Sequence, residues 1–380
     1  MFESQTAEPQ KDAMTEQQRQ IQFGSLQHLH YLIDSAGSRG VSDFHVVPNQ
    51  GTWYLTDGDL QRETDQGSVF SEEHILGWLT SAEARVGNND TFVALGHASV
   101  SYDTGNYRVR ASFRKTTIGI TVTFRLIPFN IPSVEDLELP ESVVSLMHRS
   151  SGLILIEGPT GSGKTTAIAA LLERVNEERN EHIYTIEDPV EFVHKPRGNT
   201  LFTQREIGEH AADFPSAIEN ALRSKPNIVL VGEMLNPATA KSALHAATTG
   251  HLVLTTAHAG SVNEALDAFI GQFVAEEQPQ IRTRLSQSLL AVMVQRLVPS
   301  TGRKLVPARE LLINNLNFRE MIAHQDTHLV HQSLESTAGC FSLEQDLAKL
   351  VRAGQITEAT ALDMCKKRDS LENHLRSGSR

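Results

Sequence analysis

Two stretches in the first third of the chain alternate between apolar and polar residues. In residues 107–114 the odd positions are apolar or small and the even positions are polar, whereas in residues 118–126 the even positions are apolar. A period of two is typical of strands with one buried face and one solvated face. We therefore predict a first domain over residues 21–128 that contains an antiparallel sheet with one face in solvent.

A different pattern begins at residue 151. Short runs that are apolar at every position alternate with helix-like sequence, and a Gly, acidic or Thr/His cluster follows each run. Strands that are apolar on both sides are typical of a parallel sheet with helices on both faces, so residues 151–298 are predicted to form an α/β domain. Ligands of such sheets bind at the carboxyl ends of the strands, where these clusters lie. The runs are residues 153–156, 183–186, 228–231 and 252–254.

The remaining segments lie between and beyond these two domains. Prolines at 128 and 132 interrupt the strand pattern, so we predict a linker and lead-in helix over residues 129–150. Residues 299–369 are predicted to be helical. Residues 1–20 are predicted to be a flexible polar arm, and residues 370–380 a polar tail.

Composition narrows the class of protein. The 380 residues are 39% hydrophobic and 21% charged, as in soluble globular proteins of about two domains. The net charge of -12 argues against direct nucleic-acid binding, which needs a basic face. Two cysteines predict a reducing compartment, and no run approaches the roughly 18 apolar residues that cross a bilayer. We expect a cytoplasmic protein that contacts a membrane only through a partner.

A glycine-rich segment carries the first candidate chemistry. The letters GPTGSGKTT match the pattern G-x-x-x-x-G-K-[ST], between an apolar run and a helix-favouring stretch. Glycines let the backbone curl around phosphate oxygens and present N–H groups to them. Lys164 can reach the outer phosphates, and the Thr165 hydroxyl can ligate Mg²⁺. The predicted residues that bind ATP are Gly158, Pro159, Thr160, Gly161, Ser162, Gly163, Lys164, Thr165 and Thr166.

Polar clusters follow three of the later apolar runs. Residues 185–194 contain several carboxylates, the next run ends at Glu233, and the last leads into His258. Hydrolysis of a phosphoanhydride needs a positioned Mg²⁺, an aligned water and groups that stabilise the transition state. A glutamate at a strand end can orient the water, and a histidine there can contact the γ-phosphate. The three clusters therefore predict ATP hydrolysis.

The order of these motifs resembles that of the type II secretion and type IV pilus ATPases, nearest to the PilT-like pilus-retraction branch. The phosphate loop, TIEDPVEFVH, IVLVGEM and TGHLVLTTAH follow one another as in those proteins, and the likeness extends over residues 25–362. The resemblance implies a PAS-like α+β domain over residues 21–128, a RecA-like P-loop domain over 151–298, and a homo-hexamer. It also implies a motor that drives pilus retraction or a secretion machine, through a platform protein of the inner membrane.

The resemblance also implies roles for residues of the site. By position, Glu233 would be the catalytic carboxylate. Glu187 and Asp188 would act at the water and the metal, and His251 and His258 would be the residues of the histidine motif.

Arginines of the N-terminal domain contact nucleotide in this family. Arg108 and Arg125 lie where the strand pattern matches, and Arg110 and Arg114 are further candidates. The alternative is that these arginines only line the solvated face of a strand.

Three other functions stay open. Compact relatives that serve type IVB secretion or conjugative DNA transfer share the implied architecture. A non-hydrolysing accessory subunit of a pilus motor is a second alternative, because Leu235 and Asn236 follow Gly-Glu-Met where the retraction ATPases usually have Arg-Asp. A DNA helicase or recombinase on the same core would need basic DNA-binding loops, which we do not find.

Overall fold

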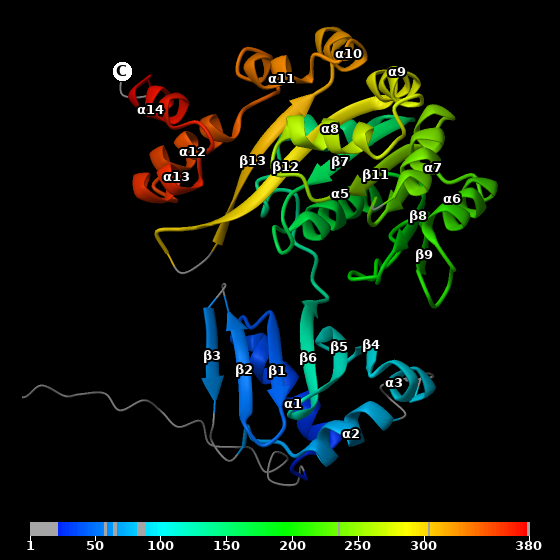
Figure 1. The fold of residues 1–380 in the computed structure, drawn as a ribbon, viewed down its shortest axis with the longest axis vertical. Coiled ribbons are helices and arrows are strands. Elements are labelled where there is room, and N and C mark those ends of the chain that lie inside the picture. The colour runs from blue at the N-terminus through cyan, green and yellow to red at the C-terminus, as the bar shows by residue number, and fades with distance from the viewer. Residues whose placement is uncertain are drawn as a thin grey trace, which may run out of the picture. The chain divides into compact units, whose positions relative to one another are not determined.

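The computed structural model describes residues 22–56, 59–63, 67–81, 89–234, 236–302 and 305–377. It separates into two compact units, with the boundary between Phe129 and Asn130 (Figure 1). The arm expected over residues 1–20 lies outside the described residues, and so does Leu235.

The first unit is a six-stranded antiparallel sheet with helices packed on one face. The strand order is β3-β2-β1-β6-β5-β4, and every neighbouring pair is antiparallel. The two predicted strands are confirmed as β5 and β6. The elements are α1 (Leu26–Ser38), β1 (Asp43–Val47), β2 (Gly51–Thr56), β3 (Asp59–Glu63), α2 (Glu72–Thr80), α3 (Asn89–Leu95), β4 (His97–Asp103), β5 (Tyr107–Thr116) and β6 (Gly119–Pro128).

The alternating pattern decides which face of this sheet is buried. Along β5, Val109, Ala111 and Phe113 point into a core that also holds Phe124 of β6 and Trp78 of α2. The polar positions between them form the opposite face, as period two requires.

The second unit is built on a seven-stranded sheet in the order β13-β12-β7-β11-β10-β8-β9. All neighbouring pairs are parallel except β12 with β13. The four predicted runs are confirmed as β7, β8, β10 and β11, whereas β9, β12 and β13 were not predicted. The strands are β7 (Gly152–Glu157), β8 (His182–Glu187), β9 (Leu201–Glu206), β10 (Ile228–Val231), β11 (Leu252–Thr256), β12 (Leu289–Pro299) and β13 (Leu305–Ile313).

Helices cover both faces of this sheet because the central strands are apolar on both sides. Ile154 and Ile156 of β7 pack with α5 on one face. Leu153 and Leu155 pack on the other face, with α6, α7, α8 and α9. The helices, with a short lead-in turn, are α4 (Glu141–Val144), η3 (Ser145–His148), α5 (Lys164–Glu178), α6 (Phe214–Arg223), α7 (Pro237–Thr248), α8 (Val262–Gly271) and α9 (Gln278–Ser288).

The C-terminal region corrects two predictions. Residues 299–369 are not wholly helical, since β13 pairs along nearly its whole length with β12. The polar tail expected from residue 370 is instead part of α14, because Leu371 is fully buried beside Leu343 and Leu347 of α12. The helices are α10 (Leu316–Ala323), α11 (Thr327–Leu334), α12 (Leu343–Arg352), α13 (Glu358–Met364) and α14 (Arg368–Ser377).

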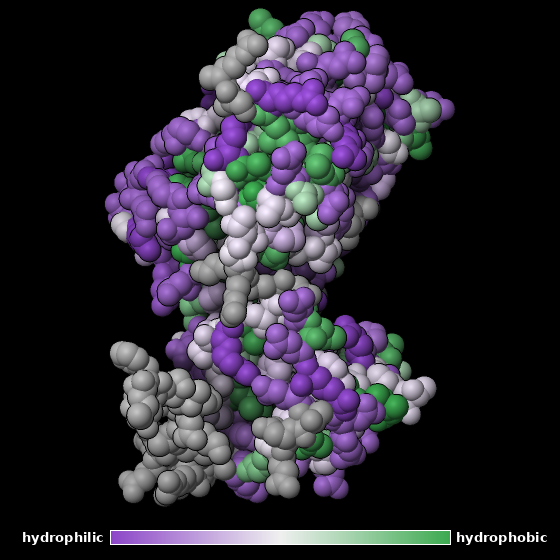
Figure 2. Space-filling model, turned by 90° about the vertical axis from the view of Figure 1, so that its left-hand side faces the viewer, coloured by the Kyte–Doolittle hydropathy of each residue, from purple (hydrophilic) through white to green (hydrophobic). Residues whose placement is uncertain are grey.

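The surface agrees with the acidic, polar composition. Figure 2 shows that hydrophilic residues dominate the face in view on each unit. Smaller apolar areas are scattered among these hydrophilic residues. Among the described helices, none has both the length and the apolar character that a membrane span requires.

Candidate functional site

The glycine-rich segment forms the loop between β7 and α5, in the second unit. Gly158, Gly161 and Gly163 have φ angles of 140°, 77° and 81°, which glycine adopts readily. A Cβ on Gly158 would overlap the carbonyl oxygen of Gln295. The loop therefore curls tightly before α5, and its backbone amides precede a helix N-terminus, where an anion is stabilised.

Lys164 and Ser162 show that this loop suits phosphate. The buried Lys164 ammonium donates hydrogen bonds to the carbonyl oxygens of Gly158 and Pro159, at 2.7 and 3.0 Å. The Ser162 hydroxyl is buried and has no hydrogen-bond partner among the described residues. A cation held only by neutral carbonyls can exchange them for phosphate oxygens, which bind it more strongly.

The charges of three carboxylates act on this ammonium. Burial lowers the pKa of Lys164, while the charges of Glu157, Glu233 and Glu191 act in the opposite direction. The phosphate loop and the acidic clusters that the sequence singled out thus lie at one site.

Glu157 belongs to the site although it was not predicted. It is the last residue of β7, is 2% exposed, and accepts a hydrogen bond of 3.1 Å from the Ala259 N–H. Burial raises the pKa of its carboxyl, and Ala259, Lys164 and His258 oppose this rise. The signal in the sequence was a charged residue that ends an otherwise apolar strand directly before Gly158.

Glu233 and His258 come together as the strand order requires. They follow β10 and β11, which are adjacent and parallel. The His258 ring nitrogen Nε2 is hydrogen-bonded to Glu233 Oε1. Beside this pair, Thr256 Oγ1 donates a hydrogen bond of 2.6 Å to the Gly232 carbonyl oxygen. The Glu233 and His258 side chains remain partly exposed, so a bound substrate can reach them.

His251 does not belong to this site. It precedes β11, and its ring nitrogen Nδ1 lies 3.3 Å from the Ala246 carbonyl oxygen. A five-residue strand, about 16 Å long, separates it from the segment that carries His258. Of the two residues of the histidine motif, only His258 therefore lies beside Glu233.

Glu187 and Asp188 follow β8 and differ in environment. The buried Glu187 carboxyl accepts a hydrogen bond of 2.6 Å from Thr185 Oγ1. Burial raises its pKa, and Thr185 and His194 oppose the rise. Asp188 is exposed and Thr165 is partly exposed, so neither side chain is shut off from a metal ion. A hydroxyl and a carboxylate are ligands that Mg²⁺ accepts.

Asn236, which departs from the family motif, has a structural role that the sequence analysis did not predict. Its side-chain oxygen accepts a hydrogen bond of 2.9 Å from the Thr239 N–H at the start of α7, and Pro237 is the first residue of that helix. Asn followed by Pro is a favourable start for a helix. This residue therefore has a reason to stand where the retraction ATPases usually have an aspartate.

The candidate arginines lie in the first unit. Arg108 Nη1 and Arg125 Nε form ion pairs with Asp103 and Asp43, at 3.2 and 2.9 Å. Arg110 is directly opposite Arg125 in the pairing of β5 with β6, and Arg114 is exposed on the same polar face. The predicted contact of these arginines with nucleotide stays a prediction.

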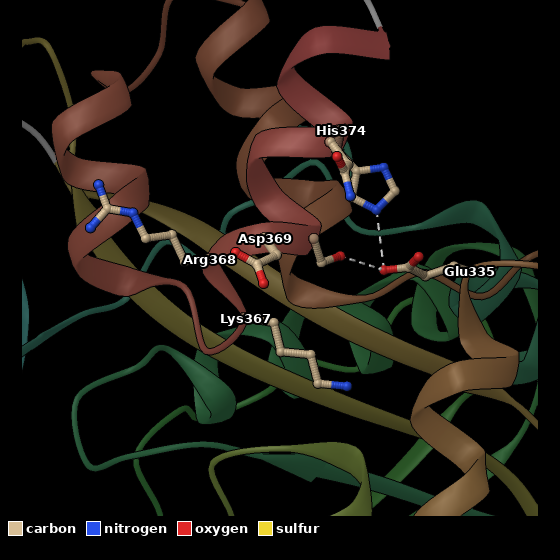
Figure 3. Close-up of a pocket in the computed structure, with 7 residues that line it drawn as sticks. Glu335, Lys367, Arg368, Asp369 and His374 are labelled. Carbon is tan, nitrogen blue, oxygen red and sulfur yellow. Dashed lines mark hydrogen bonds and ion pairs between the residues drawn. The ribbon is translucent and has the colours of Figure 1, made fainter.

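A pocket of about 550 Å³ lies elsewhere in the second unit, at α14. Figure 3 shows Glu335 on one side of it, where it accepts hydrogen bonds from His374 and Ser370, both at 3.1 Å. Its lining mixes Lys367 and Arg368 with acidic side chains, and no phosphate-loop residue contributes to it. The pocket is thus separate from the nucleotide site.

Comparison with known proteins agrees with this geometry. The model of a family described as "Type II/IV secretion system protein" matches residues 26–367. A "Twitching motility protein" of Neisseria gonorrhoeae is 37% identical over 70% of this chain and 71% of its own length. The "Type IV pilus retractation ATPase PilT" of Pseudomonas aeruginosa is 32% identical over 88% of this chain and 97% of its own.

A solved structure extends the likeness to three dimensions. The crystal structure of the pilus retraction motor PilT with bound ADP superposes with a TM-score of 0.81 at 32% identity. The match covers 91% of this chain and 99% of that one.

Proposed function

The chain belongs to the type II/IV secretion system protein family, and from this premise we propose that it is an ATP-hydrolysing motor of a type IV pilus, closest to the retraction motors. One observation carries the proposal. Lys164 of the phosphate loop is close enough to Glu233 and Glu157 to be influenced by their charges, and Glu233 is hydrogen-bonded to His258. A cation for phosphate and a carboxylate for water therefore belong to the same edge of the sheet, and hydrolysis of ATP needs both groups.

Binding of ATP begins at the phosphate loop. The Lys164 ammonium exchanges the carbonyl oxygens of Gly158 and Pro159 for oxygens of the outer phosphates. The backbone N–H groups of residues 160–163 and of the N-terminus of α5 surround the remaining oxygens. Mg²⁺, held by the Thr165 hydroxyl and Asp188, would neutralise negative charge on the phosphates.

Hydrolysis depends on the partly exposed pair of Glu233 and His258. One oxygen of Glu233 accepts a hydrogen bond from a water molecule and orients it towards the γ-phosphorus, while His258 fixes the carboxylate. The water oxygen forms the new bond to phosphorus as the water gives a proton to Glu233, the bond from phosphorus to the bridging oxygen of ADP breaks, and ADP and inorganic phosphate result. Glu187 is buried, and the hydrogen bond from Thr185 of the same strand fixes the position of its carboxyl.

The assembly is proposed from the family. The first unit would be a PAS-like domain and the second a RecA-like domain, in a homo-hexamer with ATP at the subunit interfaces. Arg108 or Arg125 of the first unit would contact nucleotide there, and Arg110 and Arg114 are alternatives. The ring would act at the cytoplasmic side of the inner membrane on a platform protein of the pilus machine.

The test is steady-state ATP turnover across a series of protein concentrations, with Glu233→Gln as the variant. We expect turnover per subunit to rise with protein concentration, and to fall by about 100-fold or more in Glu233→Gln while ATP still binds. Glu276→Gln, which changes an exposed carboxylate of the same unit, is the matched control. Unchanged turnover in Glu233→Gln would refute the role of Glu233, and tight ATP binding without turnover in the wild type would identify an accessory subunit.

A further inference from the structure

We propose that Gln295 and Arg309 form a buried link between the phosphate loop and residues 133–140, the segment that leads into the second unit just after the unit boundary. Through this link, nucleotide at the phosphate loop changes how firmly the lead-in segment is held. The proposal deepens the motor function and rests on it. Its evidence is a continuous set of hydrogen bonds inside the second unit.

Gln295 is the part of the link that touches the phosphate loop. It lies on β12, beside β7, and is 4% exposed. Its Nε2 donates a hydrogen bond of 2.7 Å to the Ser162 carbonyl oxygen, near the end of the loop. Its own carbonyl oxygen occupies the space beside Gly158, where the loop begins. Any change in the curl of the loop therefore acts on Gln295 from both ends.

Arg309 of β13 joins Gln295 to the lead-in segment. Its guanidinium donates three hydrogen bonds, to Gln295 Oε1 at 2.7 Å, to the Leu137 carbonyl oxygen at 2.6 Å and to the Glu138 carbonyl oxygen at 2.8 Å. The planar guanidinium can hold three acceptors in one fixed arrangement, which a lysine cannot do.

The cost of this arrangement indicates that it has a role. Arg309 is 5% exposed, and its guanidinium donates to neutral oxygens in all three hydrogen bonds. Burial lowers its pKa, although the charges of Asp346 and Glu138 oppose this effect. A buried cation is costly compared with an apolar side chain of the same size. Unlike an apolar side chain, the guanidinium can donate hydrogen bonds to two backbone carbonyl oxygens and so hold this segment.

The backbone of the lead-in segment is strained and depends on these hydrogen bonds. Glu138 has a φ angle of 46°, in the left-handed region where residues other than glycine are strained. Strained backbone persists only where its surroundings hold it in place. The carbonyl of this strained residue is one of the two that Arg309 holds. The segment is therefore poised to relax when Arg309 moves.

The phosphate loop has a reason to move when nucleotide binds. Lys164 must release the carbonyl oxygens of Gly158 and Pro159 to reach phosphate, and the Ser162 hydroxyl gains a partner. These changes act on the residues that Gln295 touches. Because coupling between two sites is reciprocal, a change in the lead-in segment also alters the affinity of the loop for nucleotide.

Hydrogen–deuterium exchange of the full-length protein, with and without saturating ADP, tests the link. In the wild type we expect ADP to change amide exchange in peptides that cover residues 158–166 and residues 133–140. In Arg309→Met the loop peptide should keep its response, the lead-in peptide should lose it, and ADP affinity should change by less than about threefold. The proposal is overturned if ADP does not change exchange of the lead-in peptide in the wild type. It is also overturned if this change persists in Arg309→Met.

A second variant separates the link from mere stability of the fold. Glu138→Gly removes the strain at the left-handed position without removing the carbonyl that Arg309 binds. If Arg309→Met alone unfolds, the double variant Glu138→Gly/Arg309→Met should recover a cooperative melting transition but not the ADP response of residues 133–140. Recovery of both would overturn the proposal. ADP binding and hydrogen–deuterium exchange can both be measured without ATP turnover. A protein that does not hydrolyse ATP would therefore refute the motor function, but the exchange experiment would still test the link.

Discussion

Gly158 and Gly161 offer a matched pair of substitutions within the phosphate loop. Both residues have a positive φ, 140° and 77°, so alanine is strained at either position. They differ in the space around the added Cβ. At Gly158 it would lie 2.8 Å from Ser162 Oγ and closer still to the Gln295 carbonyl oxygen, whereas at Gly161 nothing lies within 4 Å.

These surroundings set the size of the two effects. Gly161→Ala should cost only the left-handed conformation, about 1 kcal/mol of the free energy of unfolding. Gly158→Ala adds an overlap with backbone that cannot retreat, because β12 is hydrogen-bonded to both β7 and β13. We expect its total cost to be about 3 kcal/mol or more. For a unit of this size, the melting temperature should fall by about 3 °C in Gly161→Ala and by about 9 °C in Gly158→Ala.

Thermal unfolding followed by circular dichroism, at several scan rates, measures both shifts. Titration with a fluorescent ADP analogue then reports whether the loop still binds. We expect weaker binding in Gly158→Ala than in Gly161→Ala, since only the former displaces the start of the loop. Equal melting temperatures for the two variants would refute the close approach of Gln295 to the loop, and with it the steric reasoning.

Three further predictions concern single residues. Because the folded pKa of Glu157 is raised, stability falls as pH rises from the ordinary glutamate pKa, about 4.3, through the folded value. Glu157→Gln should therefore melt higher than the wild type above that window and equally below it; a gap that is independent of pH would contradict this. Lys164→Ala should weaken ADP binding at least about tenfold in the same titration, and wild-type affinity would exclude its phosphate contact. Asn236→Ala should cost about 1 kcal/mol in thermal unfolding through loss of the α7 cap, and Asn236→Asp should keep it; equal losses in both would argue against the cap.

The sequence predicted the central strands because burial on both faces leaves a simple pattern. Runs such as residues 228–231 are apolar at every position, and they became β10 and its neighbours. The edge strand β9 was missed because its residues are only half-buried and largely polar. Residues 289–299 were missed for the opposite reason. A long apolar run fits a helix as well as a strand, and pairing with β7 and β13 decides between them.

The contacts of the site depended on pairing that the sequence does not display. Glu157 meets Ala259, 102 positions along the chain, and Arg309 meets Leu137, which is 172 positions away. Local periodicity says which residues are buried, but not which distant segments they meet. The phosphate loop was predictable because all of its residues are contiguous. Glu233 and His258 were recognised separately, because each follows an apolar run, but their contact depends on the pairing of β10 with β11.

The order of strands in the sheet also bears on Glu187 and Glu233, two glutamates that each follow an apolar run in the sequence. Along the chain, Glu187 follows the phosphate loop more closely than Glu233 does. In the sheet, however, β7 is followed by β11, β10 and then β8. With about 4.8 Å between strands, the end of β10 lies about 10 Å from that of β7 and the end of β8 about 14 Å. The charges that act on Lys164 include those of Glu233 and of Glu191, which also follows β8, whereas the Glu187 side chain is buried. Strand order and exposure therefore favour Glu233, rather than the buried Glu187, for contact with the attacking water.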